Sequence, residues 1–161
     1  MLRTLEPEKL VAPLIADALA SCGIDPLQID EVILGNVVGP GGNIGRLAAL
    51  EAGLPLTIPG VTVDRQCGAG LEAVQLACRL VQAGAGELYI AGGVESASRA
   101  PWKIEKPANL YSGLPRFYGR ARFAPDAVGD PDMGEAAENV AEVYRISRTM
   151  QDEWALRSHQ R

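Results

Sequence analysis

Cys67 is the residue whose type and surroundings most clearly point to chemistry. A short β-branched run over 61–63 precedes it, and a helical pattern of apolar residues follows it. The apolar positions of that pattern are Leu71, Val74, Cys78 and Val81. Cys67 is therefore expected at the corner where a strand ends and a helix begins. The unpaired N–H groups and the positive dipole end of a helix start stabilise a thiolate and can hold a thioester oxygen.

The three residues that follow Cys67 carry almost no side chain. Gly68, Ala69 and Gly70 allow a substrate or a second loop to approach the sulfur closely. The competing interpretation is a small buried cysteine in a tightly packed helix start, because free cysteine is among the most buried residue types. The corner and the small neighbours together favour a nucleophile.

Composition and charge narrow the class of protein. The chain has 161 residues, of which 47% are hydrophobic, enough for an ordinary globular core. With 20 acidic and 15 basic residues the net charge is −5, which gives no electrostatic reason to bind nucleic acid or an anionic membrane. There is no signal-peptide pattern and no apolar run long enough to span a membrane, so a cytoplasmic location is expected.

The number and spacing of the cysteines and histidines indicate the redox compartment of the protein and whether a metal site is expected. Cys22, Cys67 and Cys78 are an odd number without a disulfide-framework spacing, which indicates free thiols in a reducing compartment. His159 is the only histidine, and the sequence has no CxxC pair. No metal site is therefore expected.

The order of the remaining elements predicts an α/β sheet covered by helices on both faces. Pro13 lies inside the first helical pattern, where it removes a hydrogen bond at about 3 kcal/mol, so a kink or a later helix start is expected. The predicted elements are a helix over 6–21 that ends near Gly23, a buried strand over 31–35, a helix over about 44–52 capped by Asn43, the strand before Cys67, the helix after it, and a buried strand over 88–91.

The glycine-rich loop 39–45 offers an alternative function. It lies between a strand and a helix, and Asp64 ends the next strand, which is the layout of a dinucleotide-binding βαβ unit. Its spacing is G-x-G-x-x-x-G rather than G-x-G-x-x-G, and the helix that follows has little more than two turns. A dinucleotide-binding oxidoreductase is therefore the weaker interpretation, and it remains open.

The segment 101–133 shows no helical or strand periodicity. It holds five prolines and five of the eight aromatic residues. Between Arg99 and Arg122 there are six basic residues and one acidic residue, Glu105. One expectation is that this stretch binds an anion or a partner subunit. The other is a loop whose aromatic side chains pack on the core while its charges stay solvated. A helix over 133–144 and another that begins after Ser147 are expected beyond it.

Five stretches of the chain, taken together, resemble the first half of the thiolases, in particular the acetyl-CoA acetyltransferase-like members. These stretches are EVILGNV, GGNIGR, VTVDRQCGAGLEAV, YIAGGVESASRAPW and DMGEAAENVAEVY. The resemblance covers nearly the whole chain and implies a partial thiolase-like layered α/β fold. Residues 1–98 would form a partial N-terminal α/β domain without its first, central strand. Residues 99–161 would form the start of the loop domain that covers coenzyme A.

The resemblance also implies a chemistry. It is acyl transfer without a metal or redox cofactor, with coenzyme A as co-substrate. Cys67 matches the cysteine that becomes acylated, and its backbone N–H fits the role of a donor to the oxyanion. Met133 matches a methionine that lines the pantetheine pocket. Asp132 stands where several acetyl-CoA acetyltransferases have histidine, which bears on the preferred acyl chain.

The implied reaction is thiolytic cleavage of a 3-ketoacyl-CoA or condensation of acetyl-CoA, as in fatty acid metabolism. The family's activating histidine, a water-orienting asparagine and a second cysteine lie in the second half of a longer chain, and His159 does not match that histidine. We therefore expect this chain to be inactive alone and the full-length form to be a homo-oligomer. A related condensing enzyme, or a non-catalytic interaction module with exposed strand edges, are the other possibilities.

Overall fold

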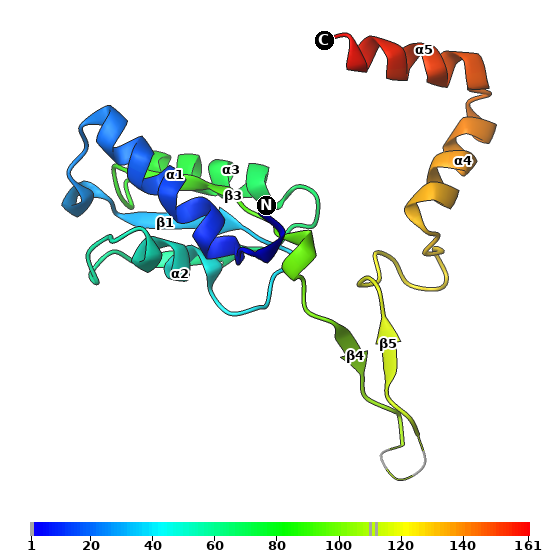
Figure 1. The fold of residues 1–161 in the computed structure, drawn as a ribbon, viewed down its shortest axis with the longest axis horizontal. Coiled ribbons are helices and arrows are strands. Elements are labelled where there is room, and N and C mark those ends of the chain that lie inside the picture. The colour runs from blue at the N-terminus through cyan, green and yellow to red at the C-terminus, as the bar shows by residue number, and fades with distance from the viewer. Residues whose placement is uncertain (1, 110, 112) are drawn as a thin grey trace. The chain divides into compact units, whose positions relative to one another are not determined.

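The structure is a computed structural model that describes residues 2–109, 111 and 113–161. The chain divides into two compact units, Met1–Trp102 and Lys103–Arg161 (Figure 1). The assignment of residues 99–161 to a loop domain that covers coenzyme A stays a prediction.

A parallel three-stranded sheet forms the centre of the first unit. Its strands are β1 (Glu31–Gly35), β2 (Gly60–Val63) and β3 (Tyr89–Gly93), in the order β2-β1-β3. Ile33 is paired with Val61 on one side and with Ala91 on the other. The central strand β1 is also the most deeply buried, and Ile33 is fully inaccessible to solvent. This confirms the predicted α/β class.

Helices cover both faces of this sheet, as the alternation of elements predicts. Helix α1 (Pro7–Cys22) and helix α2 (Ile44–Glu51) share one core with Val32 and Leu34 of β1 (Figure 1). Helix α3 (Ala69–Gln82) shares the other core with Ile33. Successive side chains of a strand point to opposite faces, so a single buried strand supplies both cores.

Helix α1 begins earlier than its internal proline suggested. It runs without a break from Pro7 through Pro13 and ends at Gly23, which has a φ of 63°. The expectation of a later start is wrong, because buried apolar residues on both sides of Pro13 offset the missing hydrogen bond. These residues are Val11, Ala12, Ile15 and Leu19. The glycine cap follows the prediction for the end of this helix.

The packed side of α3 differs from the prediction. The stripe that includes Leu71 is exposed, with Leu71 itself at 65%. The side that faces the sheet is instead made of Ala69, Ala73 and Ala77. Small side chains let the helix lie close to the strands, and hydrophobic periodicity does not say which of two apolar faces is covered. Strand β3 is likewise half-buried rather than buried.

The sheet has no gap at its centre. Strand β1 is bonded directly to β2 and to β3, with Gly35 paired to Val63 and to Gly93. The expectation that the family's first strand is absent from this chain stays a prediction.

The second unit contains a hairpin that the sequence did not reveal. Strands β4 (Lys103–Glu105) and β5 (Arg116–Tyr118) pair in antiparallel fashion. Strands of three residues are too short to show an alternating pattern, so the expectation of a segment without regular structure is wrong here. Residues 110 and 112 of that segment lie outside the described residues. Helices α4 (Met133–Val143) and α5 (Arg148–His159) follow, and Ser147 caps α5 as predicted.

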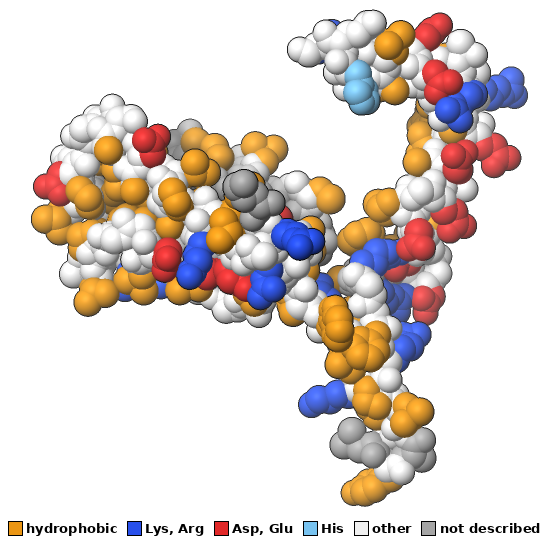
Figure 2. All heavy atoms as spheres, in the orientation of Figure 1, with side chains coloured by type: hydrophobic (Ala, Val, Ile, Leu, Met, Phe, Trp, Pro, Cys, Tyr) orange, Lys and Arg blue, Asp and Glu red, His pale blue; other side chains and the backbone are white. Residues whose placement is uncertain are grey.

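Many of the basic residues of this segment form ion pairs within the chain, and the binding of an anion or a partner subunit there stays a prediction. Four of its six basic residues pair with carboxylates, in the pairs Arg99–Glu6, Arg116–Glu105, Arg120–Asp130 and Arg122–Asp126. Much of the local positive charge is therefore neutralised within the chain. Figure 2 shows hydrophobic side chains gathered along the β4–β5 hairpin, where Phe117 and Tyr118 are exposed.

Asp30 ties the beginning of β1 to the beginning of β3. Its Oδ2 accepts hydrogen bonds from the N–H groups of Leu88 at 2.9 Å and Glu87 at 2.6 Å. These bonds, that from Leu88 first, hold the pKa of the Asp30 carboxyl below its usual value of 3.8. The ionised form is therefore favoured by folding.

We expect Asp30→Ala to lower the melting temperature at neutral pH, because two backbone donors lose their acceptor. The stabilising effect is fully present above pH 3.8 and disappears as the pH falls through the lowered pKa of the folded state. The difference in melting temperature between Asp30→Ala and the unaltered chain should therefore shrink below pH 3.8. Asp17→Ala, on the exposed side of α1, is the control and should have little effect at any pH. A difference that persists unchanged into acid would contradict the argument.

Candidate active site

Cys67 lies between the last residue of β2, Val63, and the first residue of α3, Ala69. Its side chain is exposed, so the interpretation as a buried packing residue is wrong for this chain. Cys22 and Cys78 are also free and exposed. Access to solvent alone therefore does not distinguish the three thiols, and a difference between them has to come from their local surroundings.

Two overlapping turns connect β2 to α3. The N–H of Gly68 donates to the carbonyl of Arg65 at 3.1 Å, and the N–H of Ala69 donates to the carbonyl of Gln66 at 2.9 Å. Within the described residues, no acceptor is found for the N–H of Cys67. Cys67 directly precedes Gly68, the N-cap of α3, so this N–H group lies just before the helix and is available to an external oxygen.

An ion pair connects the corner between β2 and α3 to the first turn of the helix. The guanidinium of Arg65 binds the carboxylate of Glu72 in the first turn of α3, and Arg79 binds the same carboxylate at 3.2 Å. The hydrogen bond from Arg65 holds the pKa of Glu72 below its usual value. Two cations thus offset the negative charge of Glu72 near the start of the helix, where a thiolate would otherwise be repelled.

Glycine lets the start of α3 approach the sheet. A Cβ at Gly35, the last residue of β1, would lie 2.5 Å from the carbonyl carbon of Ala69 and 2.6 Å from the nitrogen of Gly70. A Cβ at Gly93, the last residue of β3, would lie 3.2 Å from the Cα of Gly70. The first turn of α3 therefore rests on strand backbone, and any side chain at position 35 would push it away.

Asn36 and Glu95 connect the carboxyl ends of the three strands. The backbone N–H of Asn36 donates to Val63 at 3.1 Å, and its side-chain amide donates to Val94 at 2.7 Å. The Glu95 carboxylate accepts from the N–H groups of residues 37 and 38, at 2.6 and 2.9 Å. Sequence reasoning missed both residues, although each is a polar residue placed just after a strand, where parallel sheets position functional groups.

Part of the glycine-rich loop and of its surroundings is hydrogen-bonded within the chain. Asn43 caps α2 by accepting from the N–H of Arg46 at 3.1 Å, as predicted. The N–H of Gly45 donates to the hydroxyl of Thr62 at 2.9 Å. Asp64, which the dinucleotide interpretation assigns to a ribose, accepts from the backbone N–H of Gln66 at 2.8 Å. The N–H of Gly45 and the carboxylate of Asp64 are thus already bonded within the protein, which weighs against that interpretation.

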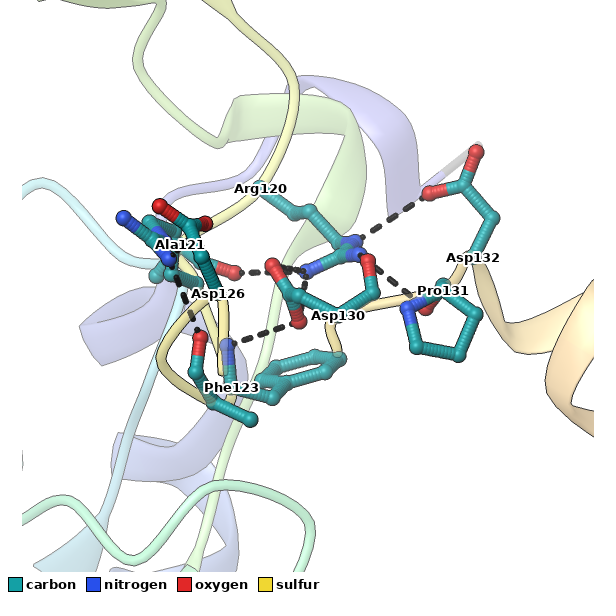
Figure 3. A network of polar contacts seen from close by, with 9 residues as sticks. Arg120, Ala121, Phe123, Asp126, Asp130, Pro131 and Asp132 are labelled. Carbon is teal, nitrogen blue, oxygen red and sulfur yellow. Dashed lines mark hydrogen bonds and ion pairs between the residues drawn. The ribbon is translucent and has the colours of Figure 1, made fainter. Parts of the chain in front are cut away.

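The other residues considered from sequence lie in the second unit. Met133 is the first residue of α4 and is 57% exposed, so its contact with a pantetheine stays a prediction. Asp132 is at the N-cap position of that helix, and its side chain pairs with Arg120 at 3.3 Å in place of a capping bond. Arg120 also binds Asp130 (Figure 3). His159 is exposed on α5, with Nδ1 2.9 Å from the carbonyl oxygen of Ala155.

The described residues also bear on metal binding and on the membrane. Across residues 2–109, 111 and 113–161, no three His, Cys, Asp or Glu side chains are grouped so that they could hold a metal ion. In the same part of the chain, no helix combines the length and the hydrophobicity needed to cross a membrane.

The fold and the corner define an α/β protein that presents an exposed thiol at the start of a helix. The family model described as "Thiolase, N-terminal domain" matches residues 1–161. The chain belongs to the thiolase family.

Named relatives agree with this family. The chain is 60% identical over 160 residues to a Staphylococcus aureus protein called "Putative acetyl-CoA C-acetyltransferase VraB", and 58% identical to the Staphylococcus epidermidis protein of the same name. A crystal structure of the Bacillus anthracis acetyl-CoA acetyltransferase superimposes with a TM-score of 0.82 at 38% identity, covering 99% of this chain and 41% of that one. The chain spans 42% of the length of the two staphylococcal proteins, and 99% of it is matched in the first.

We expect Gly35→Ala to destabilise the first unit by about 1 to 3 kcal/mol, the usual effect of overpacking. The added methyl group would overlap the backbone of Ala69 and Gly70. Urea unfolding followed by circular dichroism measures the change. Gly70→Ala is the matched control, because its Cβ would meet no atom within 4 Å. Equal stability of the two variants would show that the contact at position 35 is not tight.

Proposed function

We propose that this chain supplies the nucleophile of a thiolase-type acyl-CoA acyltransferase, with Cys67 as the residue that becomes acylated. The observation that carries the proposal is the exposed Cys67 thiol at the start of α3, beside its own unpaired backbone N–H. A helix start favours the thiolate, and a free N–H can stabilise the oxyanion that forms during acyl transfer. The family and the named relatives support the same chemistry.

The proposed reaction has two steps. In the first, the Cys67 sulfur attacks the ketone carbon of a 3-ketoacyl-CoA, and the bond from that carbon to the adjacent methylene breaks. The electron pair leaves with the enolate of acetyl-CoA, which takes up a proton, while the acyl group stays on sulfur as a thioester. In the second, the thiol of coenzyme A takes the acyl group. Run in reverse, the same steps condense two acetyl units.

Several further assignments follow from the same proposal. Coenzyme A is the co-substrate, no metal or redox cofactor takes part, and Met133 contacts the pantetheine arm. The ion pair between Asp132 and Arg120 would shape the entrance to the acyl pocket in place of a neutral side chain. The whole protein would be a cytoplasmic homo-oligomer that acts in fatty acid metabolism.

Turnover would need groups beyond those that surround Cys67. Cys78 lies more than two turns along α3, about 13 Å from the helix start by the rise per residue, so it is not placed to exchange protons with Cys67. His159 is on α5 and belongs to the other unit. We therefore propose that this chain alone forms the acyl-enzyme without repeated turnover.

We expect acetoacetyl-CoA to add one acetyl group to Cys67, because the sulfur is accessible and the acyl-enzyme has no efficient acceptor. Peptide mass spectrometry locates the adduct, and the amount of acetyl-CoA released should not exceed about one equivalent per chain. Cys67→Ala should abolish the adduct. Cys78→Ala, which removes another exposed thiol, on α3 itself, should retain it.

Two results would contradict the proposal. The first is an adduct that persists in Cys67→Ala, which would move the reactive thiol elsewhere. The second is an unmodified Cys67 in a chain whose circular dichroism spectrum shows it to be folded. Continuous release of acetyl-CoA would leave Cys67 as the nucleophile and contradict only the statement on turnover.

A further inference from the structure

Gln66, the residue before Cys67, has a backbone conformation that glutamine rarely adopts. Its φ is 51°, in the left-handed region. Among the described residues only Gln66 and Arg145 have a positive φ without being glycine. Residues held in this region usually need support from their surroundings, and such positions gather at functional sites.

The two positive values have different origins. Arg145 follows the end of α4, where the N–H groups of Arg145 and Ile146 bond back to the carbonyls of Glu142 and Ala141. That is the ordinary left-handed residue after a helix. Gln66 instead precedes a helix, where no capping motif requires a positive φ.

Asp64 supplies the support at Gln66. Its side-chain Oδ1 accepts a hydrogen bond from the backbone N–H of Gln66 at 2.8 Å. This is an Asx turn, in which a short carboxylate or amide side chain bonds to the backbone two residues further on. Asp64 and Gln66 are both exposed, so no burial by other side chains explains the conformation.

The conformation of Gln66 sets the position of Cys67 in two ways. The peptide group between residues 66 and 67 carries the N–H of Cys67, so the rotation at Gln66 orients that donor. The carbonyl of Gln66 also accepts the N–H of Ala69 at 2.9 Å, which begins α3. A different rotation at Gln66 would turn the Cys67 donor and separate the thiol from the start of the helix.

We propose that Asp64 is a positioning residue for the nucleophile. By fixing Gln66 in the left-handed region, its carboxylate holds the thiol and the N–H of Cys67 at the start of α3. The inference rests on the proposed function of Cys67 and adds a role for a residue that touches neither substrate nor sulfur. This positioning role requires the side-chain acceptor oxygen of Asp64 at its present distance from the backbone. It does not require the negative charge of the carboxylate.

Two conservative variants separate the acceptor from the charge. Asp64→Asn keeps an acceptor oxygen at the same distance along the side chain and removes the charge, whereas Asp64→Glu keeps the charge and moves the acceptor one methylene away. The readout is the rate of alkylation of Cys67 by iodoacetamide at pH 7, divided by the rate at Cys78 in the same chain. We expect Asp64→Glu to lower this ratio about fivefold, the population change that one lost hydrogen bond brings. Asp64→Asn should stay within about twofold of the unaltered chain.

Gln66→Gly in the Asp64→Glu background tests whether Asp64 acts on Cys67 through the backbone conformation of residue 66. Glycine adopts a positive φ without steric cost, so this second change should restore much of the lost ratio. Asp25→Ala is the matched control, because Asp25 accepts the same kind of bond, from the N–H of Leu27 at 3.0 Å, before a different helical turn. It should leave the ratio unchanged.

Each remaining outcome overturns the inference. If Asp64→Glu keeps the original ratio, the turn does not position Cys67. If Asp64→Asn loses reactivity, the charge of Asp64 matters and not its acceptor. If Gln66→Gly fails to restore the ratio, the effect does not pass through Gln66. Because iodoacetamide needs no acyl-CoA site, a Cys67 that is never acylated would defeat the proposed function and leave this comparison intact.

Discussion

The first turn of α3 lies directly on the backbone of β1, because Gly35 has no side chain to hold the two apart. A Cβ at that position would lie 2.5 Å from the backbone of Ala69. With the helix start lying against β1, residues 64–68 connect the end of β2 to the start of α3 in a short path. Cys67 lies on that path, so this close contact between two backbones decides where the thiol is presented.

Hydrogen bonds and an ion pair around Cys67 stabilise the same placement of the start of α3. Asn36 links the ends of β1, β2 and β3, and Glu95 holds the amides that follow Asn36. Arg65 and Glu72 connect the corner to the helix on its exposed side. The apolar core alone would allow the ends of the strands to shift, whereas these directional bonds define one geometry around the sulfur.

Local signals in the sequence predicted the elements around the site correctly. Asn43 and Gly23 marked helix ends because their side chain or backbone satisfies a specific capping geometry. The corner at Cys67 followed from a change of hydrophobic period from strand to helix. These features depend on residues that are neighbours in the chain, which is why the sequence alone was sufficient.

Features that depend on distant residues were not predictable in the same way. The sequence shows that α3 has apolar residues, but only the tight contact with the sheet explains why Ala73 is covered while Leu71 is exposed. The left-handed conformation of Gln66 depends on a bond from Asp64 that no periodicity reveals. The pairing of β4 with β5 joins strands too short to produce a pattern.

The central claim is that the start of α3 makes Cys67 the most reactive of three exposed thiols. Limited alkylation of the unaltered chain with iodoacetamide at pH 7, followed by peptide mass spectrometry, tests it directly. The account predicts that Cys67 is modified first, well before Cys22 and Cys78. Equal rates at the three cysteines would contradict it.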